Sequence, residues 1–419
     1  MFSIFAKKPF LMIHQTIISF DNTEAAFYSR SDKDLTKAYR LFSVINNKFI
    51  AKAGIFLIKI LASLHLPIFY FVKKTLFKQF CGGESLDDCR QTIAALHKFN
   101  IGSILDYAVE GGENEARFDA ACDEIIRAIQ MARGNPAIPF AVFKPSGIAS
   151  KKLLFKASAQ PPLNETDKAL FLNFQRRFKR ICESAYLNGV RLFIDSEESW
   201  LQEATDRLAY EMMRHYNRRE AIVFNTFQMY RKDMPQNLRN ALRDAAKEGY
   251  FLGAKLVRGA YMEKERKRAA RLGYEDPIFP EKKMTDEAFN EGLRLCIDHI
   301  STASLCCGSH NEESALFLTR LMNERGIARD HPGIYFAQLY GMSDHISYNL
   351  ALAGYNAVKY VPYGPVKAVI PYLIRRAEEN TAIAGQTSRE LTLIRKEMKR
   401  RKLEAQDKIT KKGGKVKNA

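Results

Sequence analysis

Residues 190–199 read VRLFIDSEES, and this stretch contains the unit on which the fold prediction rests. A short apolar run with β-branched residues, Val190–Ile194, is typical of a buried strand. It ends in charged residues that begin with Asp195, and a stretch with helical periodicity, Leu201–Tyr216, follows it. A strand followed by a helix is the repeating unit of parallel sheets, so the stretch predicts a parallel sheet if the unit recurs.

The unit recurs through the rest of the chain after residue 100. The predicted strands are Ile101–Ala108, Ile138–Phe143, Val190–Ile194, Ala221–Phe227, Lys255–Val257, Ser304–Cys307, Ile334–Leu339 and Ala357–Val361. The predicted helices are Asn114–Ala132, Glu165–Leu187, Leu201–Tyr216, Asn237–Glu248, Asp286–Ile300, Glu312–Arg325 and Pro365–Glu379. Eight such units favour an α/β fold, a distorted (βα)8 barrel of the TIM type, which typically takes about 250 residues. A doubly wound open sheet is the alternative, but no G-x-G-x-x-G motif supports it.

The segments around the predicted barrel suggest three parts. Residues 1–90 are expected to form an N-terminal helical arm, residues 91–393 the barrel, and residues 394–419 a basic tail that begins as a helix and ends disordered. The tail holds 11 Lys and Arg against 3 acidic residues, within a formal net charge of +18 for the chain. Such a charge is compatible with nucleic acid or an anionic membrane, but a solvated tail is the commoner explanation. Because no basic stripe with interleaved aromatics occurs, nucleic acid is not an expected partner.

Cysteines and apolar stretches indicate the compartment. The seven cysteines form no C-x-x-C pair, which favours reduced thiols in a cytosol-like compartment. Met1–Phe20 lacks a small-residue cleavage site, so a secretory signal is not expected. Ile50–Val72 is the most apolar stretch, but two lysines, a histidine and a proline interrupt it, so a membrane span is not predicted. Packing against the core is the favoured interpretation of this stretch, and contact with a membrane surface is the alternative.

Polar side chains end nearly every predicted strand. In chain order the strand-end residues are Asp106 with Glu110, Lys144, Asp195 with Glu197 and Glu198, Gln228 with Tyr230, Lys255 with Arg258, His310 with Asn311, Gln338 followed by the apolar Leu339, and Tyr360. In (βα)8 barrels the carboxyl ends of the strands meet at one face and carry the active site. The pattern therefore predicts an active site at that face, with several charges of each sign.

The adjacent pair Arg375–Arg376 suits a small carboxylate substrate, because the planar guanidinium binds a carboxylate through two hydrogen bonds. An ordinary charged helix face is the alternative, since Glu378 and Glu379 follow. A metal site is not predicted, because His310 has no neighbouring His or Cys at ligand spacing and no HExxH motif occurs.

Five motifs together resemble the proline dehydrogenase family. They are KLVRGAY (255–261), SHN (309–311), QLYGM (338–342), KYVPYGP (359–365) and YLIRRAEEN (372–380). The resemblance covers roughly residues 75–385, and the last motif is the most specific. The arrangement is similar to the stand-alone, mitochondrial-type branch rather than to the domain of the large bifunctional bacterial enzymes. Because the sequence has no aldehyde dehydrogenase portion, a monofunctional enzyme is expected.

The resemblance implies an oxidoreductase that binds FAD non-covalently without a Rossmann motif. In such enzymes a hydride leaves C5 of L-proline for flavin N5, and 1-pyrroline-5-carboxylate is formed during proline catabolism to glutamate. Electrons then pass to a membrane quinone. The implied location is the cytoplasm, with peripheral contact at the inner membrane, or mitochondria in a eukaryote.

The resemblance also assigns roles to individual residues. It implies that Arg375 and Arg376 hold the substrate carboxylate, and that Lys144, Asp195, Leu339, Tyr360 and Tyr372 form the substrate pocket. It implies flavin contacts from Gln228, Val257, Arg258, Gly259, Tyr261, Ser309, His310, Asn311, Gln338 and Glu379. Where some members of the family have an arginine near flavin N5, this chain has Lys255. A lysine can still donate a hydrogen bond there, but its ammonium is a point charge and lacks the planar fork of a guanidinium.

Two further expectations follow. Glu110 is expected to pair with Arg375 and close the pocket when substrate is bound, because the first strand lies beside the last helix in a closed barrel. The nearest alternative function is a hydroxyproline dehydrogenase on the same scaffold. A second alternative is a barrel enzyme that forms a Schiff base through Lys144 or Lys255.

Overall fold

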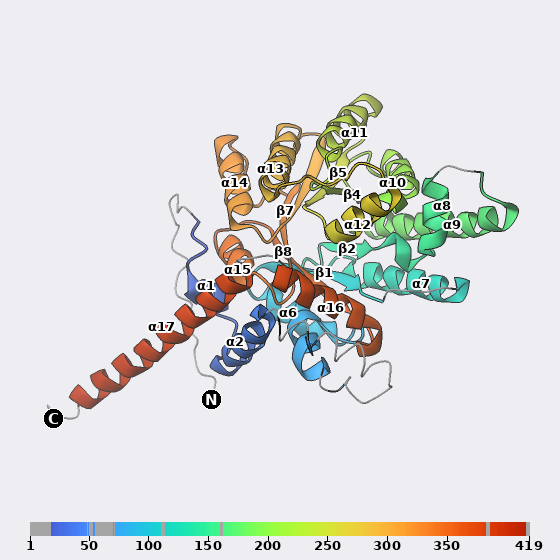
Figure 1. Cartoon of the computed structure of the whole chain (residues 1–419). Coiled ribbons are helices and arrows are strands. Elements are labelled where there is room, and N and C mark those ends of the chain that lie inside the picture. Colours follow the sequence, from blue (N-terminus) through green and yellow to red (C-terminus); the bar gives the residue numbers. More distant parts are fainter. Residues whose placement is uncertain are drawn as a thin grey trace.

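The computed structural model describes residues 18–47, 49, 53–54, 70, 72–109, 114–159, 162–382 and 386–415. For residues 377–382, 386–388 and 407–415 it describes the backbone alone. Eight parallel strands close into a barrel in the order of the sequence (Figure 1). They are β1 (Ile101–Tyr107), β2 (Phe140–Phe143), β3 (Arg191–Ile194), β4 (Val223–Gln228), β5 (Leu252–Val257), β6 (Ala303–Gly308), β7 (Ile334–Leu339) and β8 (Ala357–Tyr363). The predicted TIM-type barrel is therefore confirmed.

Helices surround the barrel and extend from both ends of the chain (Figure 1). Before β1 come α1 (Thr23–Phe27), α2 (Asp32–Asn46), the π-helix η1 (Lys73–Phe77), α5 (Lys78–Phe80) and α6 (Cys89–His97). Between the strands lie α7 (Glu115–Ala132), η2 (Pro145–Gly147), α8 (Lys151–Ser158), α9 (Glu165–Asn188), η3 (Ser199–Leu201), α10 (Gln202–Tyr216), α11 (Met234–Glu248), α12 (Met262–Leu272), α13 (Lys282–Asp298), α14 (Glu312–Glu324) and α15 (Asp344–Leu352). After β8 come α16 (Val366–Ala382) and α17 (Gln386–Lys415).

The largest difference from the predicted strands is at β5. This strand begins at Leu252, whereas the sequence pattern predicted a start at Lys255. Gly253 interrupts the β-branched pattern, which made the first half of the strand hard to recognise. Its lack of a side chain has a structural reason, because a Cβ at Gly253 would lie 2.3 Å from the carbonyl oxygen of Val223 on β4.

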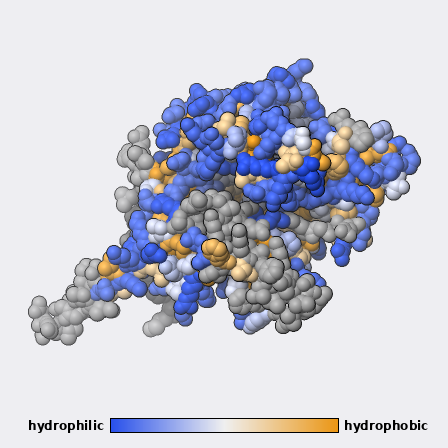
Figure 2. Space-filling model, viewed as in Figure 1, coloured by the Kyte–Doolittle hydropathy of each residue, from blue (hydrophilic) through white to orange (hydrophobic). Residues whose placement is uncertain are grey.

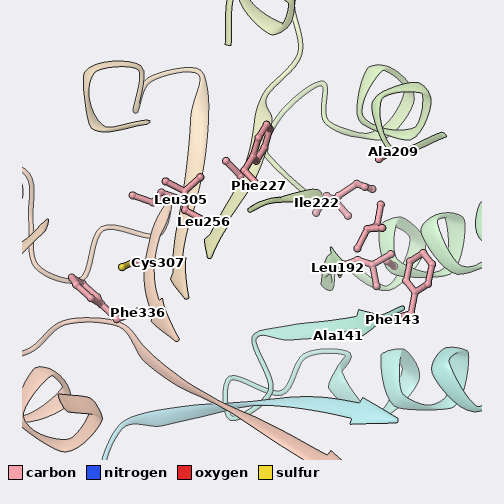
Figure 3. Packing of buried hydrophobic residues seen from close by; sticks show 14 of the residues in the cluster. Ala141, Phe143, Leu192, Ala209, Ile222, Phe227, Leu256, Leu305, Cys307 and Phe336 are labelled. Atoms are coloured by element: carbon pink, nitrogen blue, oxygen red, sulfur yellow. The ribbon is translucent and has the colours of Figure 1, made fainter. Parts of the chain in front are cut away.

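The barrel interior and the layer between strands and helices form separate apolar clusters. The interior cluster consists of Ile104, Phe140, Val142, Phe193, Ala221, Phe224, Cys306, Ala337, Val358 and Tyr360. The outer layer is larger, and Figure 3 shows part of it between the strands and the surrounding helices. Side chains alternate along a strand, so a residue two positions after an inward-facing one also faces inward. Asp106, Lys144 and Asp195 each stand two positions after a member of the interior cluster, which directs their side chains to the barrel mouth.

The N-terminal arm and the last two helices share a third apolar cluster. Phe42 of α2, Phe80 of α5, Tyr372 of α16 and Ile394 of α17 are all buried in it. Helix α17 packs along α2 and then extends away from the barrel (Figure 1). Its helical structure continues to Lys415, further than the Lys- and Gly-rich composition predicted. The first part of the predicted basic tail therefore anchors the arm.

The most apolar stretch of the sequence, residues 50–72, lies almost entirely outside the described residues, so its predicted packing stays a prediction. Among the helices that the structure describes, none combines the length and the apolar character needed to cross a membrane. The face of the molecule in Figure 2 is mostly hydrophilic, with hydrophobic residues scattered over it.

Candidate active site

Two lysines at the barrel mouth each contact a carboxylate from another strand. Lys144, which follows β2, donates to both carboxylate oxygens of Asp106 on β1 at 2.8 Å. Lys255 on β5 donates to Asp195, which follows β3, at 2.5 Å. Only 16% or less of each of these four side chains is exposed. Four of the predicted strand-end residues therefore form two largely buried ion pairs.

Tyr360 on β8 completes the second pair. Its hydroxyl accepts a hydrogen bond from Lys255 at 2.5 Å and donates one to Asp195 at 3.2 Å. The Lys255 ammonium also lies 4.4 Å from the centre of the Tyr360 ring, a cation–π distance. Burial, followed by the nearby charge of Asp195, raises the pKa of Tyr360 well above its ordinary value. The phenol is thus protonated and held by two charged partners, and we call Lys255, Asp195 and Tyr360 the Lys255 cluster.

The Lys255 cluster rests on an aromatic floor inside the barrel. The ring of Phe193 on β3 lies parallel to that of Tyr360, with centres 6.2 Å apart. Phe140 on β2 in turn stacks on Phe193, with ring centres 4.3 Å apart. Because this stack fills the barrel below Tyr360, the cluster faces only the carboxyl end of the barrel.

Arg258 forms a second polar region beyond β5. Its guanidinium donates to Asp286 of α13 at 2.7 Å and to the hydroxyls of Ser309 and Ser314 at 2.8 and 2.9 Å. The following residue, Gly259, has φ +132°, and a Cβ there would lie 2.5 Å from the ring of Tyr230. The glycine therefore allows the chain to turn closely over a buried tyrosine directly after Arg258.

The two predicted glutamines tie the loops at the mouth to one another. Gln228 donates to the carbonyl oxygen of Glu197 at 2.7 Å. Gln338 donates to the carbonyl oxygen of Ser309 at 3.0 Å and accepts from the hydroxyl of Ser347 at 2.7 Å. Both glutamines are buried, so their amides fix the backbone around the candidate site.

His310 lies next to the loop that follows β7, and Asn311 begins the next helix. The Nδ1 atom of His310 is 2.9 Å from the hydroxyl oxygen of Ser343. Burial, followed by the positive charges of Lys359 and Arg376, lowers the pKa of His310 to about 3. The Asn311 side chain accepts from the backbone of Ser314 and caps α14. His310 is therefore a neutral hydrogen-bonding group at physiological pH.

We expect His310 to make stability fall as the pH is lowered. Its pKa is lower in the folded state than in the unfolded state, so between about pH 6.5 and pH 3 the unfolded chain binds more protons. A full proton difference changes the free energy of unfolding by about 1.4 kcal/mol per pH unit. Chemical unfolding of the wild type and His310→Asn from pH 7.5 to 4.5 should show a shallower acid slope in the variant. His97→Asn, at an exposed histidine, is the control, and an equal flattening there would contradict the assignment.

Helix α16 carries the predicted carboxylate-binding residues. Tyr372 and Arg376 are one turn apart, and the Arg376 guanidinium lies 5.0 Å from the centre of the Tyr372 ring. Arg376 is only 8% exposed, and Arg375 is half-buried. The alternative of an ordinary exposed helix face therefore does not hold for Arg376. Leu339 packs against the barrel-interior cluster and also against the cluster that contains Tyr372, which joins this helix to the barrel mouth.

The remaining predicted residues differ in how far they can be placed. Val257 is half-buried at the end of β5. The ring of Tyr261 lies beneath the ammonium groups of Lys151 and Lys264, at 5.8 and 5.3 Å from them. Glu110 lies outside the described residues, and so does the side chain of Glu379, so their predicted roles stay predictions.

Two residues near the site, Glu265 and Lys359, were not singled out from the sequence, and Glu197 was noted only as a strand-end residue. Glu197 accepts hydrogen bonds from the backbone and hydroxyl of Ser146, and Glu265 of α12 accepts from the backbone and hydroxyl of Ser199. These buried carboxylates fasten the loops after β2 and β3. Lys359 is fully buried within the motif KYVPYGP. The only available signal was a charged residue in an otherwise apolar strand.

The arrangement fits FAD, the cofactor that the sequence resemblance implies. Gly308 faces the barrel interior, and a Cβ there would come within 2.9 Å of Val257 and 3.8 Å of the Lys255 side chain. The glycine thus lets β6 pass closely along the end of β5, beside the buried cation of Lys255. Further out, Arg258 and Lys282 contact the same carboxylate of α13 and supply positive charge that suits a pyrophosphate.

Comparisons with known proteins agree with this architecture. Residues 89–389 match the family model described as proline dehydrogenase. Proline dehydrogenase 1, mitochondrial, of Dictyostelium discoideum is 31% identical over 427 residues, which cover 91% of this chain and 74% of that protein. The carbapenem antibiotics biosynthesis protein CarD of Pectobacterium carotovorum subsp. carotovorum is 32% identical over 378 residues, 90% of this chain and 97% of that protein.

A solved structure shows the same fold. It is proline utilization A (PutA) from Bdellovibrio bacteriovorus inactivated by N-propargylglycine, with a TM-score of 0.68 and 18% identity over 88% of this chain. The match spans only 40% of that PutA chain. The family match extends over most of this sequence and includes all eight barrel strands and the helix that carries Arg376. The chain therefore belongs to the proline dehydrogenase family of oxidoreductases.

Proposed function

We propose that this protein oxidises L-proline to 1-pyrroline-5-carboxylate with bound FAD, as a step of proline catabolism. The Lys255 cluster carries the proposal, because it presents a buried cation, a carboxylate and a phenol at the mouth of a barrel whose family is known.

In this proposal the substrate carboxylate binds at α16. Arg376 is buried beside Tyr372, and its planar guanidinium offers two parallel hydrogen bonds to a carboxylate. Arg375 adds a second positive charge one residue earlier. The proline ring then lies between Leu339 and Tyr360, whose backbones pair between β7 and β8.

On the opposite side, Lys255 is in position to orient the cofactor. Bound FAD would supply the hydride acceptor, its N5 atom. Lys255 is a fixed donor at the barrel mouth, because Asp195 and Tyr360 hold its ammonium in place. A preorganised cation there stabilises negative charge that develops during reduction. Lys144 and Asp106 form the neighbouring wall of the pocket.

A membrane quinone as electron acceptor is part of the same proposal. The basic helix α17, which extends away from the barrel, and the apolar residues 50–72 are the two segments that suit a membrane surface. The Dictyostelium relative is named as mitochondrial, which supports a mitochondrial location if the chain comes from a eukaryote.

The visible absorption spectrum and a turnover assay test this function together. We expect the purified protein to be yellow, to be bleached by L-proline without oxygen, and to reduce an artificial acceptor when proline is added. A colourless protein that borohydride traps with a carbonyl substrate would instead support a Schiff base at Lys144 or Lys255. A yellow protein that turns over hydroxyproline faster than proline would support the hydroxyproline alternative.

The Lys255 cluster leads to a prediction about this last alternative. Two charged partners hold the Tyr360 hydroxyl, so the ring cannot swing away to admit a hydroxylated substrate. A displaced tyrosine or an unpaired hydroxyl costs about 1–3 kcal/mol, which corresponds to roughly a tenfold to hundredfold preference for proline. Tyr360→Ser should lower proline turnover and raise the relative activity on hydroxyproline, measured with one electron acceptor.

Tyr335 provides a matched control for this prediction. It also faces the barrel interior, but it lies near the amino end of β7, where its ring packs against Phe140. Tyr335→Ser makes the same chemical change inside the same barrel, so it should lower stability and leave the substrate ratio unchanged. An unchanged ratio in Tyr360→Ser would show that Tyr360 does not contact the substrate ring.

A further inference from the structure

The loop between β7 and α15, residues 340–343, has an unusual backbone. Gly341 has φ +74°, and a Cβ there would lie 1.9 Å from the carbonyl oxygen of Gln79. Ser343 has φ +50°, a conformation that residues other than glycine rarely adopt. A loop with two left-handed residues needs surrounding contacts to keep its conformation.

Three side chains supply these contacts from distant parts of the chain. Lys359 on β8 donates to the carbonyl oxygen of Met342 at 2.5 Å and lies 3.4 Å from that of Leu339. Gln79 of α5 donates to the carbonyl oxygen of Gly341 at 2.7 Å. Glu390 of α17 accepts from the backbone of Ser343 at 3.3 Å. The loop is therefore fastened by the barrel, by the N-terminal arm and by the last helix.

Lys359 is the buried centre of this arrangement, and Asp344 of α15 balances its charge. Its ammonium, with no exposed surface, lies 3.0 Å from one carboxylate oxygen of Asp344. The other oxygen of Asp344 lies 3.0 Å from the guanidinium of Arg30, between α1 and α2. Burial would raise the pKa of Asp344, but the charges of Lys359 and Arg30 outweigh it and lower this pKa to about 2. The carboxylate therefore stays ionised between two cations.

The loop stands next to the candidate active site on both sides. Leu339, directly before it, faces the barrel interior opposite Tyr360. Ser343, at its end, contacts His310. A shift of the loop would therefore move an apolar wall of the proposed substrate pocket and a residue of the proposed flavin region together.

We propose that Arg30 is a positioning residue, which holds Asp344 against Lys359 and thereby fixes the loop and the side chain of Leu339. The N-terminal arm thus takes part in shaping the substrate pocket, although it lies outside the barrel. The effect on the loop follows from the contacts alone, whereas the effect on proline binding rests on the proposed function.

Arg401 of α17 offers a matched control, because it contacts the same segment of the arm. It donates to the carbonyl oxygens of Phe27 and Arg30 at 2.9 Å and pairs with Asp32 at 2.8 Å. It thus fastens this segment of the arm to α17, whereas Asp344 pairs with Arg30 and Lys359. Because 23% of the Arg30 side chain and 21% of the Arg401 side chain are exposed, we expect both glutamine variants to fold.

The experiment compares Arg30→Gln, Arg30→Lys and Arg401→Gln in the full chain by amide hydrogen exchange and by steady-state kinetics. We expect faster exchange across residues 339–345 in Arg30→Gln alone, with most of the protection restored in Arg30→Lys. The KM for proline should rise about tenfold in Arg30→Gln, the equivalent of about 1.4 kcal/mol of binding, while kcat stays nearly constant. Such a split indicates a displaced binding wall rather than general loss of structure.

Two results would overturn the proposal: unchanged exchange in Arg30→Gln, or equally fast exchange of this loop in Arg401→Gln. Failure of the proposed function gives a different result, because a wild-type protein without proline oxidation would still show the exchange difference. In that case Arg30 positions the loop and the substrate assignment is wrong. Faster exchange without any change in KM would show that Leu339 does not contact proline.

Discussion

Replacing Lys255 with methionine is expected to lower proline turnover by about a hundredfold to a thousandfold, the loss typical when a preorganised donor is removed from an active site. It should also destabilise the protein by roughly 3–5 kcal/mol, because it leaves the largely buried Asp195 carboxylate without its cation. Turnover with saturating proline measures the loss of activity, and chemical unfolding measures the loss of stability.

Two further variants separate the roles of Lys255. The double variant Lys255→Met/Asp195→Asn removes both charges, so it should recover much of the lost stability without recovering turnover. Lys255→Arg keeps the charge and restores the donor found in some members of the family, so it should retain FAD and substantial activity. If Lys255→Met lowers stability but leaves turnover at the wild-type level, Lys255 is only a structural partner of Asp195.

The fold could be predicted because its signals are local. Each strand is a short apolar run, and a stretch with helical periodicity follows it. The order of these units along the chain is also their order around the barrel. The strand β5 was predicted three residues too short, because Gly253 serves a contact with β4 that no local pattern shows. The arm was predicted only as helical, because its packing depends on α16 and α17 at the other end of the chain.

The candidate site was predicted as a set of residues but not as a set of contacts. The alternation of side chains along the strands was sufficient to predict that Lys144, Asp195 and Tyr360 lie at one face of the barrel. Which cation meets which carboxylate depends on the closure of the barrel and on side-chain reach. Lys255 meets Asp195 and Tyr360 across the barrel interior, from strands that are not its neighbours. Sequence spacing carries no information on such a choice.

The contacts around the loop after β7 were harder still to predict. Arg30 is 314 positions away from Asp344 in the sequence, and of the three residues only Lys359, a charged residue in an apolar strand, gave any signal. Their meeting requires the arm to be folded onto α15, where Ser29 also donates to the hydroxyl of Tyr348 at 2.9 Å. Buried charge networks of this kind are set by tertiary structure, and composition reveals only that unpaired buried lysines are rare.

Arg376→Met is the second substitution for which we expect a large effect. If Arg376 binds the substrate carboxylate, its loss removes charge-assisted hydrogen bonds and should lower kcat/KM for proline by about a hundredfold to a thousandfold, or roughly 2.7–4 kcal/mol. Arg376→Lys should recover only part of this loss, since an ammonium cannot donate two parallel hydrogen bonds. Lys367→Met, at an exposed lysine of the same helix, controls for the lost positive charge and should remain near the wild-type value.

Pyrrolidine, which has the ring and amine of proline but no carboxylate, makes this test specific. The wild type should oxidise pyrrolidine poorly, because its binding does not use Arg376. Arg376→Met should then be little worse than the wild type on pyrrolidine, although it is far worse on proline. The two changes, one in the protein and one in the substrate, form a cycle that measures the coupling between guanidinium and carboxylate. Equal losses on both substrates would mean that Arg376 acts through the structure of α16 rather than by contact with the substrate. Its guanidinium lies against the ring of Tyr372, and its charge helps to lower the pKa of His310, so it has structural roles that could be lost.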